Sequence, residues 1–477
     1  MHRRRETPAH ETPRIERAGV DRRKFLAATA GFAATAFSAK ATPGGVTPVP
    51  VTRAVLTGAL AIEGGTPVRA TRLTGSGNPG TQFYDDQEQT EVRQAVETHS
   101  LFRWYGPQTP QKVAKFEQEL AKYMDVKYVL AVTSGTAALH CALTALDVGP
   151  GDEVVLPALT WYSCYNTILL TGALPVFAEV DESFNLDPED LEKKINPQTK
   201  AVMVVHLYGA PANMDGILAV ARRHNLKVLE DSAQTMGGQY KGKRLSTIGD
   251  IGIYSFQINK LITAGEGGAV VTNDRRLYER AVRFHDLGLL RPATTAALGK
   301  GQMAGFLGTN YRMNEMTGAV MRAQLRKLDT ILDAQRRRAR YVKEQIKNLP
   351  GIRLRTSHDP EGDIGITVCM LLPTKELRDK FAAAMAAENI PLGAPSSSVP
   401  LPREPYIENK VAPHAAWPTF NTPRGKSIRY GAECCPRTID ICEHTATLTI
   451  GPKYSDRDLA DIVTAIAKVH NGLLGPS

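Results

Sequence analysis

The sequence predicts an α/β protein whose main sheet is mostly parallel. From Tyr128 onward, apolar runs of strand length alternate with segments of helical periodicity. The apolar runs are continuous instead of alternating with polar residues, as in strands that are buried on both faces. The chain has 477 residues, of which 42% are hydrophobic and 22% charged, so it is long enough for about two to three domains.

The alternation can be followed along the chain. The expected strand and helix pairs are YVLAVTS with GTAALHCALTAL, EVVLPA with WYSCYNTILLTG, and AVMVVHLYG with MDGILAVARRHN, followed by the strands KVLEDSA and DIGIYSF. A helical segment over about 314–348 then ends at a Leu-Pro-Gly sequence, beyond which shorter strands and helices follow. We therefore expect a large α/β domain over residues 81–345 and a smaller C-terminal α+β domain over residues 346–477.

The first 41 residues have the pattern of an export signal. Arg22-Arg23 precedes a mildly apolar run, Phe25 to Phe37, and Ala39-Lys40-Ala41 or Ala34-Thr35-Ala36 offers a small-residue cleavage site. The run has 13 residues, fewer than the ~20 that a membrane-spanning helix needs. We expect a twin-arginine signal peptide over residues 1–41, an exported protein and no stable membrane insertion. The alternative is a basic tail with an Ala-rich helix, which would leave the protein in the cytoplasm.

Most of the chain's positive charge belongs to this N-terminal segment. It contains nine Lys/Arg and four Asp/Glu, so the rest of the chain carries a formal net charge of +4 instead of +9. The remaining basic group, Arg336 to Arg338 with Arg340, lies in a helical stretch and is expected to form a solvated helix face. Without a basic face on the folded body, nucleic acid is not an expected partner.

The cysteines and the N-terminal arm suggest no metal and no dinucleotide. Six cysteines without a CxxC pair or suitably spaced histidines predict no metal site. Whether Cys442 pairs with Cys434 or Cys435 stays open. Residues 42–80 read as a linker and an arm. Gly75 to Gly80 matches GxGxxG, but no apolar strand precedes it and Pro79 removes one backbone amide, so we reject it as a dinucleotide site.

Strand-to-helix junctions are where ligands bind in parallel α/β sheets, and the first two such junctions suit a flat, phosphorylated ligand. The sequence TSGTA, Thr133 to Ala137, ends one strand and opens a helix, so its backbone amides and helix dipole suit a phosphate. An ordinary capped helix is the alternative. Trp161 follows the next strand among polar neighbours and suits stacking on a heteroaromatic ring, whereas a core tryptophan is the alternative.

Two later junctions supply a carboxylate and an amine. Asp231, in the sequence LEDSAQ, could pair with a pyridinium nitrogen and keep it protonated, or could simply cap the next helix. Lys260, in YSFQINKLITAGEGGA, precedes the glycines at 265, 267 and 268. An amine on a short, rigid segment with backbone clearance suits a Schiff base with an aldehyde cofactor such as pyridoxal phosphate (PLP); a solvated surface lysine is the alternative. Ser255 places a hydroxyl donor near this lysine.

Together these segments resemble the DegT/DnrJ/StrS family of PLP-dependent sugar aminotransferases over about residues 80–475. The matching sequences are SGTAAL, PALTW, EDSAQ, SFQxxKxxTAGEGGAVVTND and GTNYRMNEMTGAVMRAQLRKLD. The resemblance implies the type I PLP-transferase fold, PLP as the cofactor and a homodimer with shared active sites.

The resemblance also implies a role for each matching residue. Lys260 would form the Schiff base and then move the proton. Asp231 would contact the pyridine nitrogen, Trp161 would stack on the ring and Gln234 would lie beside it near the phenolic oxygen. Gly135, Thr136 and Ser255 would hold the phosphate, joined by Asn310 from the neighbouring subunit.

Within the family, Ser255-Phe256-Gln257 and the sequence TAGEGG are most similar to glutamine:scyllo-inosose aminotransferases and aminohydroxybenzoate synthases. This similarity implies glutamine or glutamate as amino donor, a keto-sugar or ketocyclitol as acceptor, and a ping-pong reaction through pyridoxamine phosphate. Two alternatives stay open. One is a PLP-dependent sugar dehydratase, although those relatives carry His in place of Lys260. The other is an exported PLP-fold binding or sensory protein without turnover.

Overall fold

The computed structural model describes residues 58–292, 298–299, 301–395 and 400–475. The predicted signal peptide and most of the linker lie outside the described residues. A seven-stranded sheet, ordered β1-β9-β8-β5-β4-β2-β3, forms the centre of the molecule. Its strands are β1 (Tyr128–Val132), β2 (Glu153–Pro157), β3 (Leu174–Ala178), β4 (Thr199–Val205), β5 (Lys227–Asp231), β8 (Ile251–Ser255) and β9 (Gly268–Thr272).

The sheet is mostly parallel, which confirms the predicted fold class. Neighbours from β8 through β5 and β4 to β2 and β3 pair in parallel, whereas β9 runs antiparallel to both β1 and β8. This reversal arises because β8 and β9 are joined by a loop and no crossover helix, so Ser255 pairs with Gly268 across the two strands. Lys260 lies in that loop.

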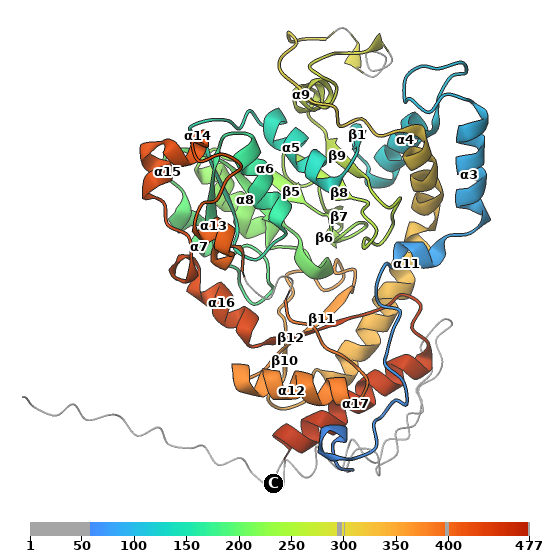
Figure 1. Ribbon diagram of the computed structural model, residues 1–477, viewed down its shortest axis with the longest axis vertical. Coiled ribbons are helices and arrows are strands. Elements are labelled where there is room, and N and C mark those ends of the chain that lie inside the picture. Colours follow the sequence, from blue (N-terminus) through green and yellow to red (C-terminus); the bar gives the residue numbers. More distant parts are fainter. Residues whose placement is uncertain (1–57, 293–297, 300, 396–399, 476–477) are drawn as a thin grey trace, which may run out of the picture.

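Helices cover both faces of the sheet (Figure 1). Side chains of β1, β8 and β9 alternate between two hydrophobic clusters, one shared with α5 and α9 and the other with α4 and α11. The helices of this part are α3 (Asp86–Glu97), α4 (Lys112–Met124), α5 (Gly135–Ala145), α6 (Tyr162–Leu170), α7 (Pro188–Lys194), α8 (Met214–Arg223), α9 (Arg275–His285) and α11 (Glu315–Ile346). A small ribbon, β6 (Gln239–Tyr240) with β7 (Lys243–Arg244), lies beside them.

A second sheet, β10 (Arg353–Leu354), β11 (Thr367–Leu371) and β12 (Thr445–Thr449), is antiparallel. It shares a core with the C-terminal half of α11 and with α12 (Lys375–Ala387) and α17 (Asp456–Leu474). The arm contributes Leu60 and Leu73 to this core. The opposite face of β11 is turned toward the large sheet, since Cys369 and Leu371 belong to the core cluster of the large sheet.

One segment of the expected small domain packs elsewhere. The short helices α13 (Pro405–Glu408), α14 (Pro418–Asn421), α15 (Pro423–Ser427) and α16 (Pro436–Glu443) stand between α12 and β12. Leu401, Ile407, Tyr430 and Ile441 of this segment join the core of the large sheet. The segment lies against α6 and the start of α7, because Tyr162 of α6 donates to Glu404 at the start of α13 (2.8 Å) and Arg437 of α16 pairs with Asp187, which caps α7. The predicted boundary at residue 346 therefore does not separate the two cores along the chain.

The arginines expected to form a solvated face on α11 are only partly solvated, because two of them bind backbone carbonyls. Arg336 donates to the Asp363 carbonyl (3.3 Å) and Arg338 to the Tyr454 carbonyl (2.7 Å), whereas Arg340 pairs with Glu361 at the surface.

All six cysteines carry free thiols, and the sulfurs of Cys434 and Cys435 are 3.9 Å apart. Across the described ranges, no helix is long and apolar enough to span a membrane.

Candidate active site

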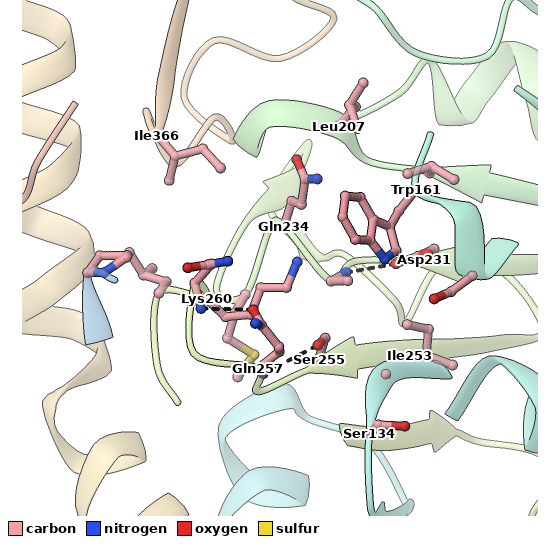
Figure 2. Close-up of a pocket in the computed structure, with 18 of the residues that line it drawn as sticks. Ser134, Trp161, Leu207, Asp231, Gln234, Ile253, Ser255, Gln257, Lys260 and Ile366 are labelled. Atoms are coloured by element: carbon pink, nitrogen blue, oxygen red, sulfur yellow. Dashed lines mark hydrogen bonds between the residues drawn. The ribbon is translucent and has the colours of Figure 1, made fainter. Parts of the chain in front are cut away.

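A cavity of 600 Å³ lies where the strands of the large sheet end and the small domain begins. Residues from β4, β5 and β8 and from the segments that follow β1, β2, β4, β5 and β8 line one side, and Ile366 and Ile450 line it from the small domain. Seven of the predicted site residues lie close together here: Gly135, Thr136, Trp161, Asp231, Gln234, Ser255 and Lys260. Figure 2 shows Lys260, Trp161, Asp231, Gln234 and Ser255 around this one pocket.

The TSGTA sequence follows β1 and opens α5, and the start of this helix packs closely against the end of β8. The Ser134 hydroxyl accepts from the Ala137 amide (3.0 Å) and caps the helix, so the amides of Gly135 and Thr136 are left without intrahelical partners. A Cβ on Gly135 would lie 2.7 Å from the Cβ of Ser255. Only glycine therefore lets the helix start approach the end of β8, where the Ser255 hydroxyl stands. Gly135 lines the same cavity.

Trp161, which follows β2, and Asp231, which ends β5, both line the cavity. Trp161 is 57% exposed although it is a large apolar side chain, which fits a stacking surface and rules out the core alternative. Asp231 ends β5 and is 4% exposed. Its carboxylate accepts from the Ala233 amide (2.9 Å) and from the Cys164 thiol (3.2 Å). Burial raises the pKa of the Asp231 carboxyl, and these donors together with Lys260 only partly oppose the rise.

Lys260 lies in the β8–β9 loop, which is closed by hydrogen bonds across its base. The Phe256 amide donates to Gly267 (2.8 Å), the Ile258 amide to Gly265 (3.0 Å), and the Lys260 amide to Gln257 (2.8 Å). Burial lowers the pKa of the Lys260 amine, although the nearby Asp231 and Cys164 oppose the shift. A lowered pKa leaves more of the amine neutral, which is the form that attacks an aldehyde and accepts a proton.

Gln234 is held by the turn that follows β4. Its Oε1 accepts from the Tyr208 amide at 3.0 Å, which leaves its NH2 group for a ligand. Asn310 stands apart from these residues. Its side chain is exposed, and its backbone forms an isolated antiparallel β-bridge with Asp286. It is not among the residues that line the cavity of its own chain. Its predicted role in the neighbouring subunit's site stays a prediction.

Sequence reasoning missed several residues of the cavity wall. Ser76 to Pro79 of the arm line it, and the Gly80 amide donates to the Lys260 carbonyl (3.2 Å). No strand precedes this GxGxxG segment among the described residues. The polar residues of this segment, next to an unusual glycine pattern, were the only sequence feature that could have indicated its place in the cavity wall. Cys164 beneath Asp231 gave no signal, since a cysteine in an apolar helix is ordinarily a core residue.

The residues present fit PLP. The cavity offers amides and hydroxyls for a phosphate, an exposed indole for a ring, a buried carboxylate for a ring nitrogen and a lysine amine, all within one volume. When bound there, PLP would supply an electron sink for charge that develops on the substrate carbon. No group of three or more His, Cys, Asp or Glu in the described part of the chain is arranged to hold a metal ion.

Fold and site together define a type I PLP-dependent transferase. The chain belongs to the DegT/DnrJ/EryC1/StrS aminotransferase family, which it matches over residues 83–467, and is a PLP-dependent aminotransferase.

Named relatives and a solved structure support this assignment. The chain is 37% identical to GDP-perosamine synthase of Escherichia coli O157:H7, over 72% of this chain and 91% of that protein. It is 32% identical to L-glutamine:2-deoxy-scyllo-inosose aminotransferase of Streptomyces paromomycinus, over 88% and 100%. The structure of 3-amino-5-hydroxybenzoic acid synthase superposes with a TM-score of 0.67 at 29% identity, covering 83% of this chain and 97% of that one.

Proposed function

We propose that this aminotransferase moves the amino group of glutamine or glutamate to a cyclic ketone, either a keto-sugar or a ketocyclitol, in two half-reactions. The observation that carries the proposal is the half-buried Lys260 amine in one cavity with Asp231 and Trp161. The relatives support the acceptor class, because one is named for a perosamine sugar and another for 2-deoxy-scyllo-inosose. The name of the second also supports glutamine as donor.

Each side chain then has a defined task. Lys260 would bind the cofactor through its amine, and this amine, once freed by the amino donor, would hold the proton that leaves the substrate carbon. Asp231 would keep a positive charge on the ring nitrogen, since a buried carboxylate favours an adjacent cation. Trp161 would orient the ring, while the start of α5 and Ser255 would bind the phosphate.

The donor half-reaction is the direct test. Mixing the yellow PLP-loaded protein with glutamine or glutamate should bleach its visible absorbance, and a cyclic ketone should then restore it. A panel of ketones, offered to protein already charged with the amino group, identifies the acceptor. The Lys260→Ala variant is the control and should not bleach on this timescale. An absorbance that no donor changes would favour a binding or sensory protein, and release of water without amination would favour a dehydratase.

We infer further that two copies share their active sites. Exposed apolar side chains gather on neighbouring segments: Leu101, Tyr105, Leu287, Leu289, Leu307 and Met316. The segments adjoin, because the Glu315 amide donates to the Leu101 carbonyl (3.0 Å) and the Leu287 amide to the Thr309 carbonyl (3.2 Å). The same surface carries Asn310. Exposed apolar patches of this kind mark protein interfaces.

Mixed dimers test this arrangement. We expect Lys260→Ala and Asn310→Ala to be poorly active as separate dimers. If Asn310 serves the neighbouring site, a mixed dimer purified through two different tags has one intact site and should recover about half the wild-type activity, because a twofold dimer has two equivalent sites. If Asn310 served its own chain, both sites of the mixed dimer would be damaged and nothing would be recovered. A monomer by light scattering would also refute the proposal.

We also propose export by the twin-arginine route, on the strength of Arg22-Arg23 and the apolar run after it. This route carries folded proteins, so PLP would be loaded before export. Cell fractionation of the wild type and of a variant with both arginines changed to Lys tests it. Equal cytoplasmic retention of the two proteins would argue for the basic-tail alternative.

A further inference from the structure

The turn after β4 adopts a backbone conformation that its residue type disfavours. Tyr208 has a φ of 56°, in the left-handed region that favours glycine, yet it is a bulky residue and 8% exposed. Such a conformation persists only where its surroundings hold it, and such residues cluster at functional sites. Here it aims the Tyr208 amide at the Oε1 of Gln234, 3.0 Å away. In Figure 2 Leu207, from the same turn, and Gln234 lie on one side of the pocket.

One side chain of the small domain holds this turn. Arg355 follows β10, and its guanidinium donates through Nη1 to the Leu207 carbonyl (3.2 Å) and through Nη2 to the Tyr208 carbonyl (3.0 Å). Its side chain is 3% exposed. The next segment adds a backbone contact, in which the Ile364 amide donates to the Gly209 carbonyl (2.9 Å). The small domain therefore helps to set the conformation of the turn, together with Asn185 of the large domain, whose Oδ1 accepts from the Leu207 amide (2.8 Å).

Arg355 is itself fixed by an ionic group. Its Nη2 lies 3.1 Å from Asp363, and Lys343 of α11 lies 2.7 Å from the same carboxylate. Although burial alone would raise the pKa of the Asp363 carboxyl, Arg355 and Lys343 lower it below its usual range. The other carboxylate oxygen accepts from the Gly365 amide (2.7 Å). A planar guanidinium in this setting can serve two carbonyls and a carboxylate at once, which an ammonium cannot.

We propose that Arg355 is a positioning residue for the active site. It holds the Leu207–Tyr208 turn so that the Tyr208 amide fixes the Oε1 of Gln234, and the NH2 of Gln234 is thereby directed at the oxygen substituent of the bound ring. The inference rests on PLP as cofactor and on Gln234 beside it, and it makes the docking of the small domain a determinant of cofactor binding. Nothing in it depends on the identity of donor or acceptor.

A double-mutant cycle on the PLP dissociation constant, measured by titrating the apoprotein, tests the proposal. We expect Arg355→Met and Gln234→Ala each to weaken PLP binding about tenfold, because Gln234→Ala removes the donor to the ring oxygen and Arg355→Met releases the turn that positions this donor. The double variant should also be weakened about tenfold, since both changes break one pathway. A loss of about a hundredfold in the double variant, the product of independent effects, would overturn the proposal. An unchanged constant in Arg355→Met would do so as well.

Two further variants guard the interpretation. Arg353→Met removes a neighbouring arginine that pairs with Glu182 at the surface, and it should leave the PLP dissociation constant unchanged. Arg355→Lys keeps a cation beside Asp363 but cannot serve both carbonyls. If Arg355→Met fails to fold, the same cycle is run with Arg355→Lys, and additive losses there count equally against the proposal. The cycle measures only PLP binding and no turnover. It therefore remains a valid test of the role of Arg355 even if no amino donor supports transamination.

Discussion

Replacing Lys260 by Ala should reduce turnover by about 10⁴-fold or more, because the variant loses both the amine that binds the cofactor and the group that moves the proton. The proposed phosphate site at the start of α5 does not involve this side chain, so PLP should still bind, more weakly. Steady-state kinetics measures the first effect, and equilibrium dialysis the second.

Borohydride reduction identifies the lysine directly. Reduction of the loaded wild type followed by peptide mass mapping should place the adduct on Lys260, and the Lys260→Ala variant should give none. Lys375→Ala, which removes an exposed lysine of α12 paired with Asp379, is the matched control and should keep full activity. Full activity in Lys260→Ala, or an adduct on another peptide, would contradict the assignment.

The sequence alone could predict the sheet and most of the site because both depend on local patterns. Continuous apolar strands indicate burial on both faces whatever the partner. Ligands of a parallel sheet bind at the carboxyl ends of its strands, so Asp231 and Trp161, which follow two such ends, could be assigned to one site from the sequence. The start of α5 could be predicted because Gly135 stands where a helix begins. The structure shows why this residue is a glycine, since a larger side chain would collide with Ser255.

Other features depend on contacts between segments far apart in the chain. The antiparallel β9 follows from the loop that carries Lys260, and periodicity does not reveal strand direction. The segment from Leu401 to Ile441 consists of short helices, so no local pattern indicates which of the two sheets it packs on. Arg355 contacts a turn that lies about 150 positions earlier in the chain. The strained φ angle of Tyr208 in this turn is visible only in the backbone coordinates. Such long-range contacts are visible in coordinates and not in a single sequence.

Replacing Asp231 by Asn should slow both half-reactions by about 10²- to 10³-fold, because the amide cannot offset a buried positive charge on the ring nitrogen. The shape of the side chain is retained and the Ala233 amide can still donate to its oxygen, so thermal unfolding of the apoprotein should change little. Stopped-flow measurement of the donor half-reaction separates this loss from binding.

The Cys164 contact supplies the matched control for that prediction. The thiol donates to Asp231 and lies beside the Thr160 hydroxyl (3.1 Å), with both side chains fully or almost fully buried. Cys164→Ser keeps a donor for the carboxylate and should stay within about tenfold of the wild-type rate, whereas Cys164→Ala leaves Asp231 with fewer donors and should be slower than Cys164→Ser. If Asp231→Asn kept the wild-type rate, the ring would not need a protonated nitrogen, and the carboxylate would only cap the turn after β5. A fall in rate for Asp231→Asn with no difference between the two Cys164 variants would leave the charge essential and remove the thiol from the site.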